Sequence, residues 1–203
     1  PQCTTRRCWD GPGSKRCQDS GKHAVAVTLL SVVGRGRVDP QAVTDAIRPK
    51  PAPITIMHST NELGTVQPIA EIGQIAKEAD VYFHTDAVQS AGKIPIDINA
   101  MQLDLLSISG HKLYAPKGIG ALYVRGGTKL RQLLYGGHHQ RGARPGTENV
   151  ASAVALGKAA QLAKQSLEQA SVRLTAFRHQ LETGLPPASP PSFVNCADAL
   201  RVP

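Results

Sequence analysis

Residues 81–112 read VYFHTDAVQSAGKIPIDINAMQLDLLSISGHK and contain two largely apolar runs, each followed at once by polar residues. The runs at 81–84 and 104–109 are short, which is typical of strands buried in a sheet. In open α/β sheets, ligands bind outside the carboxyl ends of the strands. This part of the chain therefore predicts both a sheet and a binding site at one edge of it.

Strands and helices alternate on either side of this stretch. We expect further β structure at 24–33, 54–58 and 120–124. Asp39-Pro40 predicts the start of a short helix at 41–47. Apolar residues at helical spacing predict a helix at 68–77 and one long helix from 151 to about 181, and a further short helix is expected at 86–92. This alternation, with strands that are apolar along their length, predicts an α/β fold: a mostly parallel sheet with helices on both faces.

The size and composition of the chain fit a globular protein. Its 203 residues, 41% of them hydrophobic, suffice for one domain or one domain plus part of another. No stretch approaches the roughly 20 apolar residues of a membrane span, and residues 1–17 lack the apolar core of a secretory signal. We therefore expect a cytoplasmic protein with no membrane partner.

The net charge of +8 raises the possibility of a nucleic-acid-binding protein. Residues 1–50 hold nine Lys and Arg against four Asp and Glu, whereas residues 51–203 hold fourteen against eleven. Most of the excess is thus confined to the first quarter of the chain, without interleaved aromatic residues. This distribution does not favour a surface that follows a phosphate backbone, so no nucleic-acid partner is expected.

The cysteines and paired histidines do not predict a metal site. Cys3, Cys8 and Cys17 lack the paired two-residue gaps of zinc knuckles, and Cys196 lies far from them. The adjacent histidines at 138–139 point in opposite directions if that segment is extended. We expect free thiols in a reducing compartment and no metal.

Three clusters of polar residues follow predicted strands: NELG at 61–64, HTDAVQ at 84–89 and SGHK at 109–112. They supply what pyridoxal 5'-phosphate (PLP) requires, namely an amine for its aldehyde, a carboxylate for its ring nitrogen, and donors for its phenolic oxygen and phosphate. Asp86 and Lys112 follow successive strands. Neighbouring strands about 4.8 Å apart could place the two groups at opposite ends of one ring. Taken singly, Asp86 could cap a helix and Lys112 could be a surface lysine.

Four motifs in order resemble those of cysteine desulfurases, which are class V, fold type I, PLP-dependent enzymes. They are NELG at 61–64, TDAVQ at 85–89, SGHKLYAPKGIG at 109–120 and RPGTEN at 144–149. Selenocysteine lyases are near relatives of this family. The resemblance covers residues 32–185.

The resemblance implies a role for each matching residue. Lys112 and His111 would be the catalytic residues, and Lys112 would bind PLP covalently as a Schiff base. Asp86 would pair with the ring nitrogen. Asn61 and Gln89 would hydrogen-bond the phenolic oxygen.

The same resemblance implies which residues would contact the phosphate and which partners the protein would have. Ser109 and His111 would contact the phosphate. Thr147 would reach the phosphate of a second subunit, which implies a homodimer, although Thr147 could also be the N-cap of the long helix. The substrate would be a small amino acid, and a separate protein would accept the sulfur.

The resemblance also implies a domain organisation. Residues 1–31 are expected to be an atypical, poorly ordered segment, with no strand or helix between 1 and 23. Residues 32–150 would be part of the PLP-binding large domain. Residues 151–185 would be the helix that leads to the small domain, and residues 186–203 a Pro-rich irregular tail.

Several family features have no match in this sequence. The family carries an N-terminal Gly/Thr phosphate loop and a histidine that stacks on PLP, and neither is found in residues 1–31. Its nucleophilic cysteine lies in a later loop that the surroundings of Cys196 do not resemble. We therefore expect an incomplete chain that encodes the Schiff-base and proton-transfer half of the chemistry. Residues 1–31 could be a frame-shifted reading.

The motifs leave the function open between related and unrelated classes. L-cysteine, converted to L-alanine and an enzyme persulfide for iron–sulfur cluster assembly or other sulfur transfer, is the favoured substrate. A selenocysteine lyase or another class V enzyme is the nearest alternative. A basic nucleic-acid-binding protein and a non-catalytic scaffold are the alternatives outside enzymes.

Overall fold

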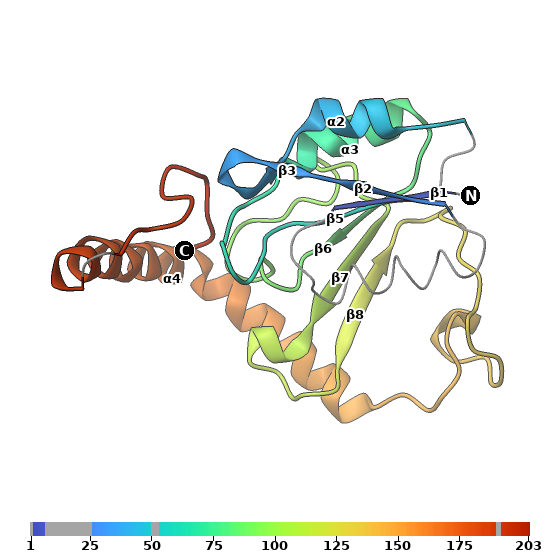
Figure 1. Ribbon diagram of the computed structural model, residues 1–203. Coiled ribbons are helices and arrows are strands. Elements are labelled where there is room, and N and C mark those ends of the chain that lie inside the picture. Colours follow the sequence, from blue (N-terminus) through green and yellow to red (C-terminus); the bar gives the residue numbers. More distant parts are fainter. Residues whose placement is uncertain (1, 7–25, 50–52, 190–191) are drawn as a thin grey trace.

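The computed structural model describes residues 2–6, 26–49, 53–189 and 192–203, and a single sheet runs through its centre (Figure 1). The sheet has six strands in the order β2-β1-β5-β6-β7-β8. All neighbours are parallel except β8, which runs antiparallel to β7. The strands are β1 (Gln2–Arg6), β2 (Ala26–Leu30), β5 (Ile54–Met57), β6 (Phe83–Asp86), β7 (Leu105–Ser109) and β8 (Gly120–Val124).

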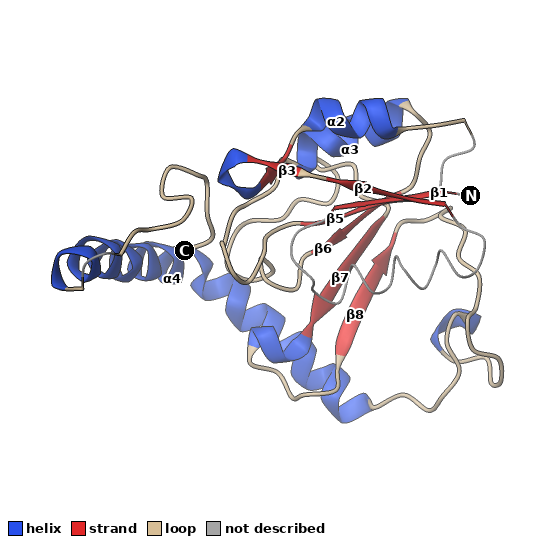
Figure 2. Ribbon diagram, viewed as in Figure 1, coloured by secondary structure: helices blue, strands red, loops and turns tan. Residues whose placement is uncertain are grey.

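Helices lie on both sides of this sheet, as Figure 2 shows. Helices α2 (Pro40–Ala46) and α3 (Ile69–Glu78) contact each other and cover one face. The 39-residue helix α4 (Val150–Ala188) runs along the other side. The α/β fold with a mostly parallel sheet is therefore confirmed. A small antiparallel pair, β3 (Val32–Val33) and β4 (Arg37–Val38), is joined by the 3-10 turn η1 (Gly34–Gly36).

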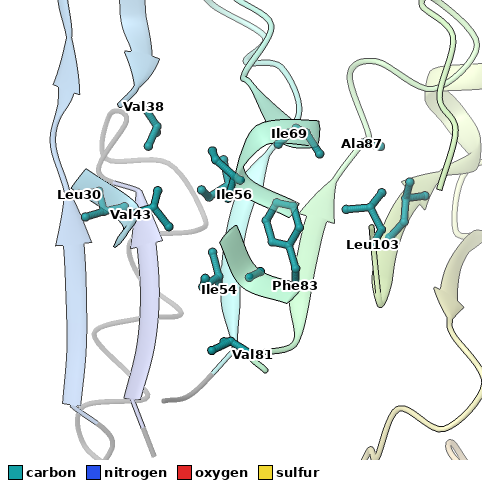
Figure 3. Packing of buried hydrophobic residues seen from close by; sticks show 13 residues of the cluster. Leu30, Val38, Val43, Ile54, Ile56, Ile69, Val81, Phe83, Ala87 and Leu103 are labelled. Atoms are coloured by element: carbon teal, nitrogen blue, oxygen red, sulfur yellow. The ribbon is translucent and has the colours of Figure 1, made fainter. Parts of the chain in front are cut away.

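The hydrophobic core fills the space between the sheet and the pair α2 and α3 (Figure 3). Alternate residues of each strand enter it because successive side chains of a strand point to opposite faces. Phe83 and Ile54 are fully buried, and Ile72 meets them from α3. The intervening residues of the central strands are only half-buried and belong to the other face. The core thus fixes which side chains are left for a site.

Local signals explain where α2 begins. The side chain of Asp39 accepts a hydrogen bond from the backbone N–H of Gln41, and Pro40 occupies the first turn. An N-cap acceptor followed by proline is a strong helix start, because proline lacks only an N–H that the first turn leaves unpaired. The helix predicted at 41–47 is confirmed within one residue at each end.

Three predicted details are wrong. Residues 2–6 form β1, whereas no strand was expected before residue 24. Residues 87–93 form successive turns rather than a helix, because Gly92 adopts a positive φ of 70° and closes the segment. Helix α4 continues to Ala188 because the N–H of Ser189 still reaches the carbonyl of Leu185 beyond the two prolines.

Residues 192–203 have no regular element but are attached to the rest of the fold. The N–H of Val66 donates to Leu200, and the N–H of Val202 donates to Gly64. The guanidinium of Arg201 donates to both carboxylate oxygens of Glu182, at 2.7 and 3.0 Å. Among the residues that the structure describes, no helix has the length and apolar character needed to cross a membrane.

Gly73 tests how tightly α3 packs. A Cβ atom at this buried glycine would collide with the backbone carbonyl of Met101, which cannot move independently of its loop. We expect Gly73→Ala to lower the free energy of unfolding by about 1–3 kcal/mol, as overpacked cores do. Gly157→Ala on exposed α4, where a Cβ atom meets nothing, should raise it by up to about 1 kcal/mol. Urea denaturation of both variants checks this pair, and equal effects would contradict the packing.

His58 should make stability depend on pH. This side chain is 2% exposed, and burial lowers its pKa below the ordinary value of 6.5. The unfolded chain therefore binds a proton at a higher pH than the folded chain, so stability is full above pH 6.5 and is lost as the pH falls below it. Denaturation between about pH 5 and 7 should show a smaller loss in His58→Gln. An unchanged slope in that variant would rule out His58 as the source.

Candidate active site

Asp86 is the last residue of β6, and its half-buried side chain lies on the face opposite the core. In the sheet it pairs with Met57 of β5 and with Ser107 of β7. Its Oδ1 accepts a hydrogen bond of 2.9 Å from the N–H of Val88. Because no helix follows, this bond closes a turn rather than capping a helix. A carboxylate offers about four acceptor positions, so it retains capacity for a ligand.

Lys112 lies in η2 (Gly110–Leu113), the 3-10 turn that directly follows β7. Gly110 makes this turn possible, because a Cβ atom there would collide with Ile119. The N–H of Gly110 donates to the carbonyl of Ile119, and the N–H of Ala115 donates to that of Gly110. Tyr114 ends the turn in the left-handed region, with φ 64°. The loop thus closes on itself and holds Lys112 at the strand end.

Ser109 and His111 form a polar pair beside Lys112. Ser109 Oγ lies 2.7 Å from Nδ1 of His111, with the donor set by the histidine tautomer. Ser109 is the last residue of β7, and His111 is exposed. The pair presents a hydroxyl and an imidazole to solvent at the same strand end as the lysine.

The sheet register places Asp86 and Ser109 on the same face of two neighbouring strands. Ser107 pairs with Asp86, and Ser109 follows two residues later on the same face of β7. Asp86 therefore ends β6, and Lys112 lies three residues beyond the end of β7, the adjacent parallel strand. Neighbouring strands lie about 4.8 Å apart. A carboxylate, an amine and a hydroxyl–imidazole pair at one edge are the donor set that PLP requires, so these residues fit that cofactor.

The remaining predicted residues lie in connecting segments. Asn61 is exposed in the turn after β5, where Thr60 Oγ1 accepts from the N–H of Leu63. Gln89 is half-buried in the turn that follows Asp86. Thr147 is exposed and is not the N-cap of α4, because Asn149 Oδ1 accepts from the N–H of Ser152. Their roles toward a cofactor stay predictions.

Two side chains near the site carried no assigned role in the sequence analysis. Gly92 packs against Leu113 of η2, so the next residue, Lys93, lies near the turn that carries Lys112. Burial, and then the positive charge of Lys112, lower the pKa of Lys93. His84 lies two residues before Asp86 and contacts hydroxyls on both neighbouring strands. The period of two along a strand places residues 84 and 86 on one face, and this signal was available from the sequence. The proximity of Lys93 depends on the turn at 87–93, and no signal in the sequence indicated it.

The cysteine and histidines outside the site have local roles. Cys196 lies beside η1, within 3.8 Å of where a Cβ atom on Gly36 would stand, and Arg35 pairs with Asp198 at 2.7 Å. Nδ1 of His139 accepts a hydrogen bond from the N–H of Gly146. Within the described part of the chain, no group of three or more His, Cys, Asp or Glu side chains is arranged to hold a metal ion.

Comparison with known proteins shows the family to which this fold belongs. The family model described as Aminotransferase class-V matches residues 17–200, and the chain belongs to that family. The resemblance expected from the motifs is confirmed, and it extends beyond 32–185 at both ends.

Individual relatives show which members of the family this chain is similar to. The chain is 53% identical to cysteine desulfurase IscS of Anaeromyxobacter dehalogenans over 161 residues, which cover 78% of this chain and 40% of the relative. A solved structure of SspA in complex with cysteine is 44% identical, with a TM-score of 0.76 over 79% of this chain and 47% of the other. The NifS-like protein from Rickettsia africae has 27% identity and a TM-score of 0.90 over 99% and 55%. The chain thus spans roughly half or less of these proteins.

Lys93 provides a test of how close the two lysines are. Replacing Lys112 with methionine removes one positive charge, so the pKa of Lys93 should rise and less of its amine should be neutral at a given pH. Labelling of Lys93 by acetic anhydride, followed by peptide mass spectrometry, should become slower. The exposed Lys117→Met variant serves as the control and should leave the rate unchanged. Equal rates in all three proteins would place Lys93 out of range of Lys112.

Proposed function

We propose that this chain is the PLP-binding part of a cysteine desulfurase, which converts L-cysteine to L-alanine and passes the sulfur to iron–sulfur cluster assembly or another sulfur acceptor. The observation that carries this proposal is that Asp86 ends β6 and that Lys112 lies in the turn directly after β7, the adjacent parallel strand. Its support outside the structure is the identity to cysteine desulfurases across most of the chain.

Each residue that would hold PLP contacts a particular part of the cofactor. Lys112 binds the aldehyde, and Asp86 holds a proton on the ring nitrogen. Asn61 and Gln89 donate to the phenolic oxygen. Ser109 and His111 donate to the phosphate, and their hydrogen bond of 2.7 Å fixes one side chain against the other.

The chain's own groups perform the proton transfers. When bound, PLP withdraws electron density from the α-carbon of the amino acid. Asp86 makes this withdrawal effective because its negative charge keeps the ring nitrogen protonated. With the amino acid bound, the amine of Lys112 would remove the α-proton and later return one. Catalysis of this kind requires the lysine to be neutral at that moment.

The sulfur-transfer step requires a cysteine thiolate on the enzyme. The thiolate attacks the substrate sulfur, the carbon–sulfur bond breaks, and its electron pair is protonated to leave alanine, while the enzyme cysteine becomes a persulfide. Cys196 does not take this role, because it lies beside η1 rather than beside η2. We assign the nucleophile to the part of the family's length that this chain does not span.

The proposed assembly is a homodimer in which Thr147 of one subunit reaches the phosphate bound by the other. Its exposure leaves Thr147 accessible to a second chain, and the cap of α4 does not use it. We place the protein in the cytoplasm, where a reducing environment keeps cysteine thiols available for sulfur chemistry.

Reductive trapping tests the cofactor assignment. The full chain is mixed with PLP, reduced with sodium borohydride, digested and analysed by mass spectrometry. We expect the added mass on the peptide that contains Lys112, because the half-buried amine lies at the proposed ring edge. Lys112→Ala should lose the added mass, and Asp86→Asn should weaken binding before reduction.

The matched controls are two other lysines of the same region. Lys117→Ala removes an exposed lysine of the same loop, and Lys93→Ala removes the nearby half-buried one. Both variants should keep the mass on Lys112. Transfer of the mass to Lys93 or Lys117 in the unmodified sequence would overturn the assignment of Lys112.

A further inference from the structure

A single imidazole connects the three central strands of the sheet on the face opposite the core. Nδ1 of His84, on β6, lies 2.6 Å from Oγ1 of Thr55 on β5. Nε2 of the same ring lies 2.8 Å from Oγ of Ser107 on β7. Both distances are short for hydrogen bonds of this kind, and all three side chains are half-buried. The result is a continuous Thr55–His84–Ser107 connection across three strands.

The register relates this connection directly to Asp86. Thr55 pairs with His84, whereas Ser107 pairs with Asp86. The bond from His84 to Ser107 therefore runs diagonally across the two strands. It starts two residues before Asp86 on β6 and ends at the residue of β7 that pairs with Asp86. Asp86 is the last paired residue of β6, and the chain turns away after it. The connection thus holds the end of β6 against β7 at the last position where the strands are paired.

The chemistry of the three groups makes the connection independent of protonation. A hydroxyl both donates and accepts, so Thr55 and Ser107 can satisfy the imidazole in either tautomer and also when it is protonated. The bonds need not break when charge changes nearby. Such a connection maintains the spacing between a carboxylate on β6 and a lysine just beyond β7 throughout a cycle of proton transfers.

We infer that His84 is a positioning residue for Asp86 and, through β7, for the turn that carries Lys112. This inference rests on the proposed function, because it concerns the geometry of the proposed cofactor site. His84 touches no reacting atom in this account. It acts by holding the Asp86 carboxylate at a fixed distance from the end of β7.

The test compares His84 with its neighbour on the other face. His84→Leu removes both hydrogen bonds and keeps an apolar side chain of moderate size. Thr85→Val removes one cross-strand bond of the same strand, from Oγ1 to the carbonyl of Ile56 at 2.9 Å, on the core face. A merely structural role would make the two variants alike once their loss of stability is taken into account.

Two readouts are used on the full chain. The first is the affinity for PLP, which His84→Leu should weaken by about tenfold, the scale at which outer hydrogen-bond partners of ligand-binding groups act. The second is amide hydrogen exchange at Val88, whose N–H donates to Oδ1 of Asp86. Exchange there should be faster in His84→Leu but not in Thr85→Val, measured against the global unfolding rate of each variant.

The double variant Thr55→Val with Ser107→Ala keeps His84 and removes its two hydroxyl partners. It should reproduce both effects of His84→Leu, and His84→Gln should recover part of the affinity. Equal effects of His84→Leu and Thr85→Val, or no effect of the double variant, would overturn the inference. If the unaltered chain shows no Lys112-dependent PLP binding, the proposed function fails, and exchange at Val88 alone decides the role of His84.

Discussion

Parallel pairing of β5, β6 and β7 is the constraint on which the rest of the structure depends. Because a strand alternates its side chains, the register that buries Phe83 and Thr85 also turns His84 and Asp86 to the opposite face. A slip of one residue would bury the carboxylate and expose the aromatic ring. The hydrophobic core and the candidate site are therefore set by one choice of register, and neither can change without the other.

Close backbone approach is the second condition for the site. Gly110 lies against Ile119, and Gly92 lies where a Cβ atom would meet Leu113 of η2 and Ala163 of α4. These contacts bring the loop that follows β7, the turn that follows β6 and the long helix into one packed unit. The lysine turn is consequently supported from three directions, although two of its four residues, His111 and Lys112, are polar.

Much of this arrangement could be predicted from the sequence, because the signals were local. Apolar runs predicted β5, β6 and β7, and Asp39-Pro40 predicted the start of α2. The turn after Asp86 does not form the expected helix because Gly92 has a positive φ. That conformation is set by packing against η2, which is distant in sequence. β1 was missed for a similar reason, because its pairing with β2 and β5 is not encoded by its own pattern. For the site, the positions of Asp86 and Lys112 after apolar runs could be predicted from the sequence. The proximity of Lys93 to Lys112 could be recognised only from the fold.

The length of α4 has a mechanical consequence. A helix of 39 residues is about 58 Å long at a rise of 1.5 Å per residue, much longer than any strand of the sheet. It contacts η2, the turn that holds Lys112, and extends well past the sheet from there. Its far part is held a second time, because Arg201 pairs with Glu182 while the adjacent Val202 donates to Gly64. α4 is thus a rigid strut anchored at two separate points, and it joins the lysine turn to the segment after β5.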